Sequence, residues 1–106
     1  MNFEGKKIEC YCLRGSGRKS RVMEYHKVND IDFGFYESKE EKAFYAIHLD
    51  SGFAAVTLES KGYRQNTAFA ELKKQVAEIP KVKFEKKLPE LKKQLKELGF
   101  DFPLNG

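Results

Sequence analysis

Four side chains of this sequence can bind a metal ion through sulfur or nitrogen. They are the only cysteines and histidines of the chain: Cys10, Cys12, His26 and His48. Four ligands of these types make a closed tetrahedral zinc site. Cys10 and Cys12 are two residues apart, so both project from one face of a strand. The sequence therefore predicts a structural zinc, held by all four residues or by a partial site with both cysteines, and no other cofactor. The alternative is that the cysteines are small buried residues and the histidines are partly exposed.

A cysteine beside a histidine can also act as a nucleophile with its base. Cys10 with His26 or His48 would make such a pair, but a cysteine in the middle of a strand is rarely exposed enough to attack a substrate. No third residue stands out to orient the histidine, and the motifs GxxxxGK[ST], GxSxG, HExxH and CxxC are missing. We therefore expect a protein without catalytic activity, and we expect no small-molecule substrate.

Four basic residues lie in or directly after the glycine-rich segment RGSGRKS. The cations are Arg14, Arg18, Lys19 and Arg21. A basic hairpin tip can enter a nucleic-acid groove or contact phosphates. Further along the chain, Tyr63 and Arg64 add an aromatic ring and a cation, which together can stack on single-stranded bases. We predict that these six residues contact nucleic acid or a partner protein, and the alternative is a solvated turn.

The net charge of +4 is unevenly distributed, because the middle of the chain is acidic and both ends are basic. This layout argues against a protein that coats nucleic acid and against an acidic mimic of DNA. Four acidic residues are candidates for contact with a basic surface of a partner: Asp32, Glu37, Glu40 and Glu41. The last three could also bind a hard cation, but Lys39 and Lys42 neutralise them, and a solvated turn is the alternative.

The first hairpin is predicted from alternating hydrophobic residues. A half-buried strand over 3–13 is followed by the turn RGSGRKS and by a returning strand over Arg21–Val28. If opposite residue numbers add up to an even value near 36, His26 lies opposite Cys10. This register would bring a histidine to the two cysteines.

Three more strands complete the predicted sheet. Phe33–Tyr36 is a short aromatic strand, and 43–50 pairs with 53–60 around the turn Ser51-Gly52. In this second hairpin we expect the core-facing residues to be Tyr45, Ile47 and Leu49, with Ala54, Val56 and Leu58 on the same face.

The last third of the chain predicts two helices. Hydrophobic residues at helical spacing indicate one helix over 67–79, which Asn66 or Thr67 can cap and Pro80 ends. Val82 and Phe84 alternate with lysines, which predicts a short strand or an extended link between the two helices. A leucine face indicates a second helix over 89–98, with Pro89 at its first position. Phe102 and Leu104 predict that the C-terminal tail docks on the domain.

Strands followed by helices within 106 residues predict a single domain, 1–106, of the α+β class. We expect an antiparallel sheet of four to five strands followed by two C-terminal helices packed on one face. The start of the sequence, MNFEGKK, has no secretory signal, and no apolar run approaches the ~20 residues needed to span a bilayer. With two cysteines, which indicate a reducing compartment, we expect a cytoplasmic protein without membrane contact.

In general character the chain resembles the small proteins encoded by prophages and other mobile elements. It is short and rich in lysine, glutamate and aromatic residues, with strands before helices and no catalytic signature. Anti-CRISPR proteins, including inhibitors of Cas9, are a prominent class of these proteins. The resemblance implies a non-enzymatic phage or mobile-element protein that inhibits or modulates a host nucleic-acid-processing complex, such as a Cas9-type nuclease, through protein–protein contacts. The alternative is a small basic DNA- or RNA-binding protein that uses the 14–21 hairpin tip.

Overall fold

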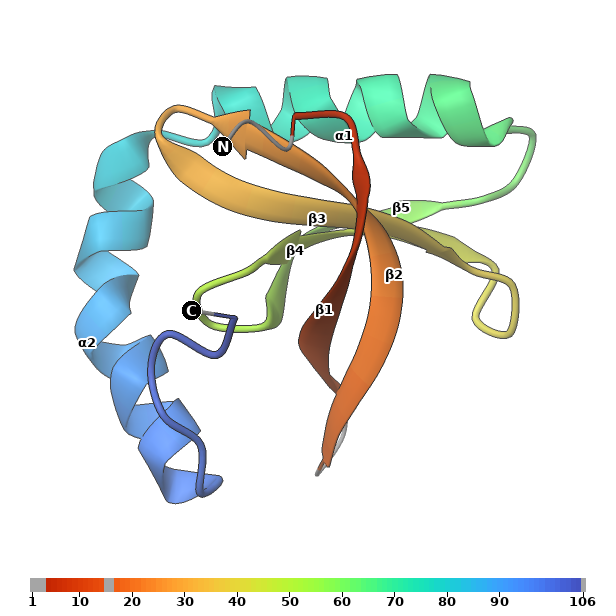
Figure 1. The fold of residues 1–106 in the computed structure, drawn as a ribbon. Helices are drawn as coiled ribbons and strands as arrows, with labels where there is room; N and C mark the ends of the chain where they lie inside the picture. The colour runs from red at the N-terminus through yellow and green to blue at the C-terminus, as the bar shows by residue number, and fades with distance from the viewer. Residues whose placement is uncertain (1–3, 15–16, 106) are drawn as a thin grey trace.

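The computed structural model describes residues 4–14 and 17–105. Its strands are β1 (Lys7–Arg14), β2 (Gly17–Val28), β3 (Ile31–Ser38), β4 (Ala43–His48) and β5 (Phe53–Glu59), and its helices are α1 (Gln65–Glu78) and α2 (Lys81–Glu97). The strands form one antiparallel sheet in chain order, and α1 lies across β4 and β5 (Figure 1). The predicted α+β class, with five strands before two helices, is confirmed. No helix within the described residues is long and apolar enough to cross a membrane.

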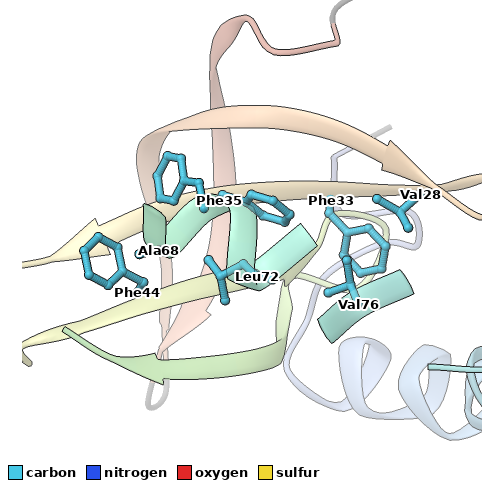
Figure 2. Close-up of a cluster of buried hydrophobic side chains, with 9 residues drawn as sticks. Val28, Phe33, Phe35, Phe44, Ala68, Leu72 and Val76 are labelled. Carbon is cyan, nitrogen blue, oxygen red and sulfur yellow. The ribbon is translucent and has the colours of Figure 1, made fainter. Parts of the chain in front are cut away.

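The sheet separates two hydrophobic clusters. The cluster under α1 contains Val28, Phe33, Phe35, Phe44, Ala46, Ala68, Phe69, Leu72 and Val76 (Figure 2). The cluster on the other face contains Cys10, Cys12, Met23, Tyr36, Ile47 and Leu49. This second face is covered because the sheet curls until β1 meets the turn after β4, where the amide of Leu13 donates to the carbonyl of Gly52 at 2.9 Å.

Strand β4 is buried on both faces, which the alternation of its residues does not predict. The sequence predicts Val56 and Leu58 on the same face as Ile47. This prediction is wrong, because Val56 pairs with Ala46 and Leu58 pairs with Phe44. Directly opposite residues share a face of the sheet, so Val56 and Leu58 pack against the cluster under α1.

Both helices begin earlier than predicted. Helix α1 begins at Gln65, and Arg64 occupies its N-cap position without a side-chain cap. Helix α2 begins at Lys81 and contains Pro89 in its interior, so the predicted strand or link before Pro89 is wrong. Phe84 lies four residues before Leu88 and extends the apolar face by one turn, which outweighs the single helical hydrogen bond that Pro89 cannot make.

The C-terminal tail docks as predicted. The amide of Leu104 donates to the carbonyl of Asp50 at 2.7 Å. The side chain of Asn105 then binds the backbone of Tyr11, accepting from its amide at 2.6 Å and donating to its carbonyl at 2.8 Å. The tail therefore covers the outer edge of β1 at Tyr11.

Candidate functional site

The structure places the cysteines and the histidines on opposite faces of the sheet. Cys10 pairs with Arg21, so the predicted register that puts His26 opposite Cys10 is wrong. His26 pairs with Phe33 instead, and its ring lies 4.7 Å from the ring of Phe35 on the side of α1. His48 also lies on that side, with its ring centroid 6.3 Å from that of Phe33. Within residues 4–14 and 17–105, no group of three or more Cys, His, Asp or Glu side chains is arranged to hold a metal ion.

Neither cysteine is placed as the nucleophile of a cysteine–histidine pair. Burial raises the pKa of the Cys10 thiol, which keeps it in the unreactive neutral form at pH 7. Cys12 is fully buried, and its Sγ lies 3.9 Å from the hydroxyl of Tyr36. His26 contacts carboxylates instead, with Nδ1 at 2.8 Å from Glu4 and Nε2 at 3.2 Å from Glu24.

The basic residues lie on a strand rather than in a loop. The sequence predicts a turn up to Ser20, but β2 already begins at Gly17, so Arg18, Lys19 and Arg21 belong to β2. Gly15, Ser16 and the side chain of Arg14 lie outside what the structure describes.

Alternation along β2 directs Arg18 and Arg21 to opposite faces. The guanidinium of Arg18 lies 4.2 Å from the ring centroid of Tyr11 and 5.4 Å from that of Phe100. The guanidinium of Arg21 lies 5.2 Å from the ring centroid of Tyr36. The two arginines therefore belong to different surfaces.

The remaining predicted contact residues are spread over the molecule. Lys19 is exposed on β2, opposite Cys12, whereas Tyr63 and Arg64 are exposed at the start of α1. Among the described side chains, the predicted contact residues of β2 and those at the start of α1 therefore lie on different elements.

The acidic residues divide into two groups. Asp32 lies near the start of β3 and accepts a hydrogen bond from the hydroxyl of Tyr25. Glu37 lies five residues further along the same strand, on the opposite face and about 17 Å away. Glu40 and Glu41 are exposed in the following turn, where Glu41 accepts from the hydroxyl of Tyr45. Asp32 therefore lies on the other face of the sheet from Glu37, and Glu40 and Glu41 lie in the turn after β3.

Strands β2 and β3 are neighbours over only half their length. Their pairing runs from Val28–Ile31 to Glu24–Phe35 and stops there, while β2 extends back to Gly17 and β3 continues to Ser38. Figure 1 shows the β1–β2 hairpin turning away from the β3–β4 hairpin beyond this point. An open cavity of about 400 Å³ lies between the diverging strands, and we call it the β2–β3 gap.

The β2–β3 gap has apolar and charged walls. Three cations and two carboxylates line it, namely Lys7, Arg21, Lys39, Glu24 and Glu37, together with the apolar side chains of Val22 and Phe69. Val22 is 60% exposed, an unusual value for a valine within a strand. The Nε atom of Arg21 is buried and is the one such side-chain atom in the described chain without a hydrogen-bond partner. The sequence did not predict this site. Two adjacent apolar residues, Val22 and Met23, were a signal for it, because only one of them can face the core of a half-buried strand and the other must be exposed.

A second cavity, of about 360 Å³, lies between the β4–β5 hairpin and α2. His48 lines it, with its ring stacked 5.4 Å from that of Phe84 and its Nδ1 at 2.8 Å from Ser51 Oγ. Burial lowers the pKa of His48 and keeps its imidazole neutral. Ser51 Oγ also donates to the carbonyl of His48 and accepts from the amide of Phe53. This hydroxyl therefore stabilises the turn between β4 and β5.

Comparison with known proteins adds no assignment to these sites. No protein-family model matches the chain, and no curated protein and no solved structure is significantly similar to it. Among the described surfaces, the β2–β3 gap combines unpaired strand edges with exposed apolar surface and charged side chains, and an unpaired strand edge can pair with another chain.

Proposed function

We propose that this chain is a non-enzymatic binding protein that inhibits or modulates a host nucleic-acid-processing complex in the cytoplasm through protein–protein contacts. The observation that supports the proposal is the β2–β3 gap, where β2 runs past the end of its pairing with β3. Proteins usually cover or block a free strand edge, because it can pair with another chain. An edge left open beside the exposed Val22 is a surface for a partner. The choice of target rests on the resemblance in composition to mobile-element proteins such as anti-CRISPR proteins.

The placement of the cations favours a protein partner over nucleic acid. Binding to a phosphate backbone relies on several cations that face the same way. Arg18 and Arg21 face opposite sides of the β1–β2 hairpin, and each guanidinium lies over an aromatic ring of this chain. Direct nucleic-acid binding through residues 14–21 is the competing function, and the experiment below separates the two.

The test is affinity capture with the tagged protein from a lysate that contains defined targets, including Cas9 with its guide RNA, with and without nuclease treatment. We expect a nucleic-acid-processing protein to be retained after nuclease treatment, and the purified target to lose activity at one equivalent of inhibitor. Loss of all captured material on nuclease treatment would replace this proposal with nucleic-acid binding.

A matched pair of variants localises the contact. Val22→Asp introduces a carboxylate beside the β2–β3 gap, and Thr57→Asp introduces the same group on exposed β5. We expect only Val22→Asp to weaken capture of the target. Equal effects of both variants would contradict a contact at the β2–β3 gap.

A further inference from the structure

We infer that the β2–β3 gap is a strand-insertion site that accepts one extended, acidic segment of the partner protein between β2 and β3. The inference rests on the proposed function and specifies how the partner is held. Insertion of this kind uses backbone hydrogen bonds for affinity and alternate side chains for specificity. Three features of the described residues support it: the direction of the unpaired backbone groups, the covering of the other edge of the hairpin, and the chemistry of the walls.

The backbone of β2 directs unpaired groups into the gap. The amide of Tyr25 donates to the carbonyl of Lys6 at 2.9 Å, and the carbonyl of Tyr25 accepts from Gly5 at 2.7 Å, so Tyr25 turns its backbone groups toward the β1 side. Successive residues of a strand direct these groups to opposite sides. Val22 and Ser20 therefore direct theirs toward β3, with which they are not paired.

The facing edge of β3 is unpaired as well. The carbonyl of Asp32 accepts from the amide of Leu49 at 3.1 Å, so the backbone groups of Asp32 point toward β4. By the same alternation, the backbone groups of Phe35 and Glu37 point toward β2. Phe35 is paired with Glu24, where the β2–β3 ladder ends, and Glu37 lies beyond its end. One extended chain placed about 4.8 Å from each strand would pair with both edges.

The chain covers part of the other edge of the same hairpin itself. Asn105 binds both backbone groups of Tyr11, and Leu13 donates to Gly52, so at these two residues the outer edge of β1 is paired with the tail and the β4–β5 turn. No comparable cover extends over Ser20 and Val22 on the inner edge of β2 within the described residues. The contrast indicates that the inner edge is kept for another chain.

The walls of the gap select the side chains of the inserted segment. Arg21 and Val22 are neighbours, so they lie on opposite faces of β2. The Arg21 face presents a buried Nε without a partner. The two carboxylates of the lining, Glu24 and Glu37, lie on the Val22 face by the same alternation, and with Lys7 and Lys39 the lining keeps one net positive charge. The Val22 face presents exposed apolar surface next to Phe69 of α1. A segment in which carboxylates alternate with β-branched residues satisfies both faces at once.

The test uses two acetylated, amidated peptides, EVEVEVE and KVKVKVK, in an NMR titration of the intact protein. We expect EVEVEVE to shift the amide signals of Ser20, Val22 and Glu37, and to slow hydrogen exchange at Val22 and Glu37 by about tenfold or more. KVKVKVK should bind at least about tenfold more weakly, because it places cations against Arg21 and Lys39. No binding of EVEVEVE, equal binding of both peptides, or shifts confined to other strands would overturn the inference.

Two substitutions at one position test the backbone pairing. Val22→Pro removes an amide that faces the gap and takes no part in the β1–β2 ladder, a placement that strand edges tolerate. Val22→Thr keeps this amide. We expect Val22→Pro to lose EVEVEVE binding and Val22→Thr to retain it, and equal binding by the two would overturn the inference. If Val22→Pro fails to fold in a thermal melt, Lys39→Glu serves as the test and should weaken EVEVEVE binding, while unchanged binding would contradict the inference.

The outcome separates the insertion site from the proposed function. A nuclease-resistant target captured equally by wild type and Val22→Pro, without EVEVEVE binding, would refute strand insertion and leave the proposed function standing. Binding of EVEVEVE with the expected shifts, without capture or inhibition of any target, would refute the proposed function and leave the strand-insertion site standing.

Discussion

Replacing Asn105 by alanine should detach the C-terminal tail from the outer edge of β1. The side chain of Asn105 makes three hydrogen bonds to backbone groups distant in sequence. It accepts from the amide of Tyr11 at 2.6 Å and donates to the carbonyls of Tyr11 at 2.8 Å and Leu49 at 2.7 Å. Alanine removes all three bonds and leaves the amide and carbonyl of Tyr11 open to solvent.

The expected loss of stability follows from these contacts. A hydrogen bond contributes about 0.5–1.5 kcal/mol net to the free energy of unfolding. The two bonds to Tyr11 are exposed, so water replaces them and each contributes near the lower limit, whereas the bond to Leu49 is partly buried. Together they give about 2 kcal/mol, which for a domain of this size lowers the melting temperature by about 10 °C.

Urea unfolding of Asn105→Ala, with hydrogen exchange at the amide of Tyr11, tests this reasoning. The matched control is Asn66→Ala, whose side chain accepts only from the amide of the next residue at 2.9 Å, and it should cost about 0.5 kcal/mol or less. If Asn105→Ala is no less stable than Asn66→Ala, or if exchange at Tyr11 stays slow, the tail does not cover β1 as described.

Three further predictions concern the interior. Gly34→Ala should lower the free energy of unfolding by about 1–3 kcal/mol, because a Cβ at this position lies 2.6 Å from Met23 Sδ. An unchanged urea midpoint would show that Met23 shifts to accommodate the methyl group without loss of stability. Burial lowers the pKa of His48 from 6.5, so the unfolded state binds the proton more readily and stability should fall as the pH drops below about 6.5. His48→Phe should flatten this dependence, and an identical pH profile for the variant would contradict it. Cys10 and Cys12 are buried, so a thiol reagent at pH 8 should label the native protein at least about a hundredfold more slowly than the denatured one; equal rates would show that the thiols are accessible.

The register of the first hairpin shows why the predicted zinc cluster could not be placed from sequence. A shift of one residue in pairing moves every side chain of a strand to the other face. The segment RGSGRKS is compatible with several turn lengths, and the pairing continues to Arg14–Gly17, closer to the turn than expected. The resulting register sets Cys10 opposite Arg21 and leaves His26 on the face of α1.

The amino-acid sequence was sufficient for the features that depend on local periodicity. The order of strands and helices, the α+β class and the apolar face of α1 follow from alternation, helical spacing and the positions of proline and glycine, and the docking of the tail follows from its large apolar residues. These signals arise between residues a few positions apart, so they can be recognised without knowing what packs against them.

The candidate site depends on contacts between distant parts of the chain. The curl of the sheet brings Leu13 to Gly52 and Asn105 to Tyr11, and it is accompanied by the end of the β2–β3 pairing at Glu24. Arg21 and Val22 face a cavity because their strand leaves its neighbour there. In a flat sheet the same residues would form an ordinary paired strand. The open edge of β2 therefore results from long-range packing, which the periodicity of the sequence does not encode.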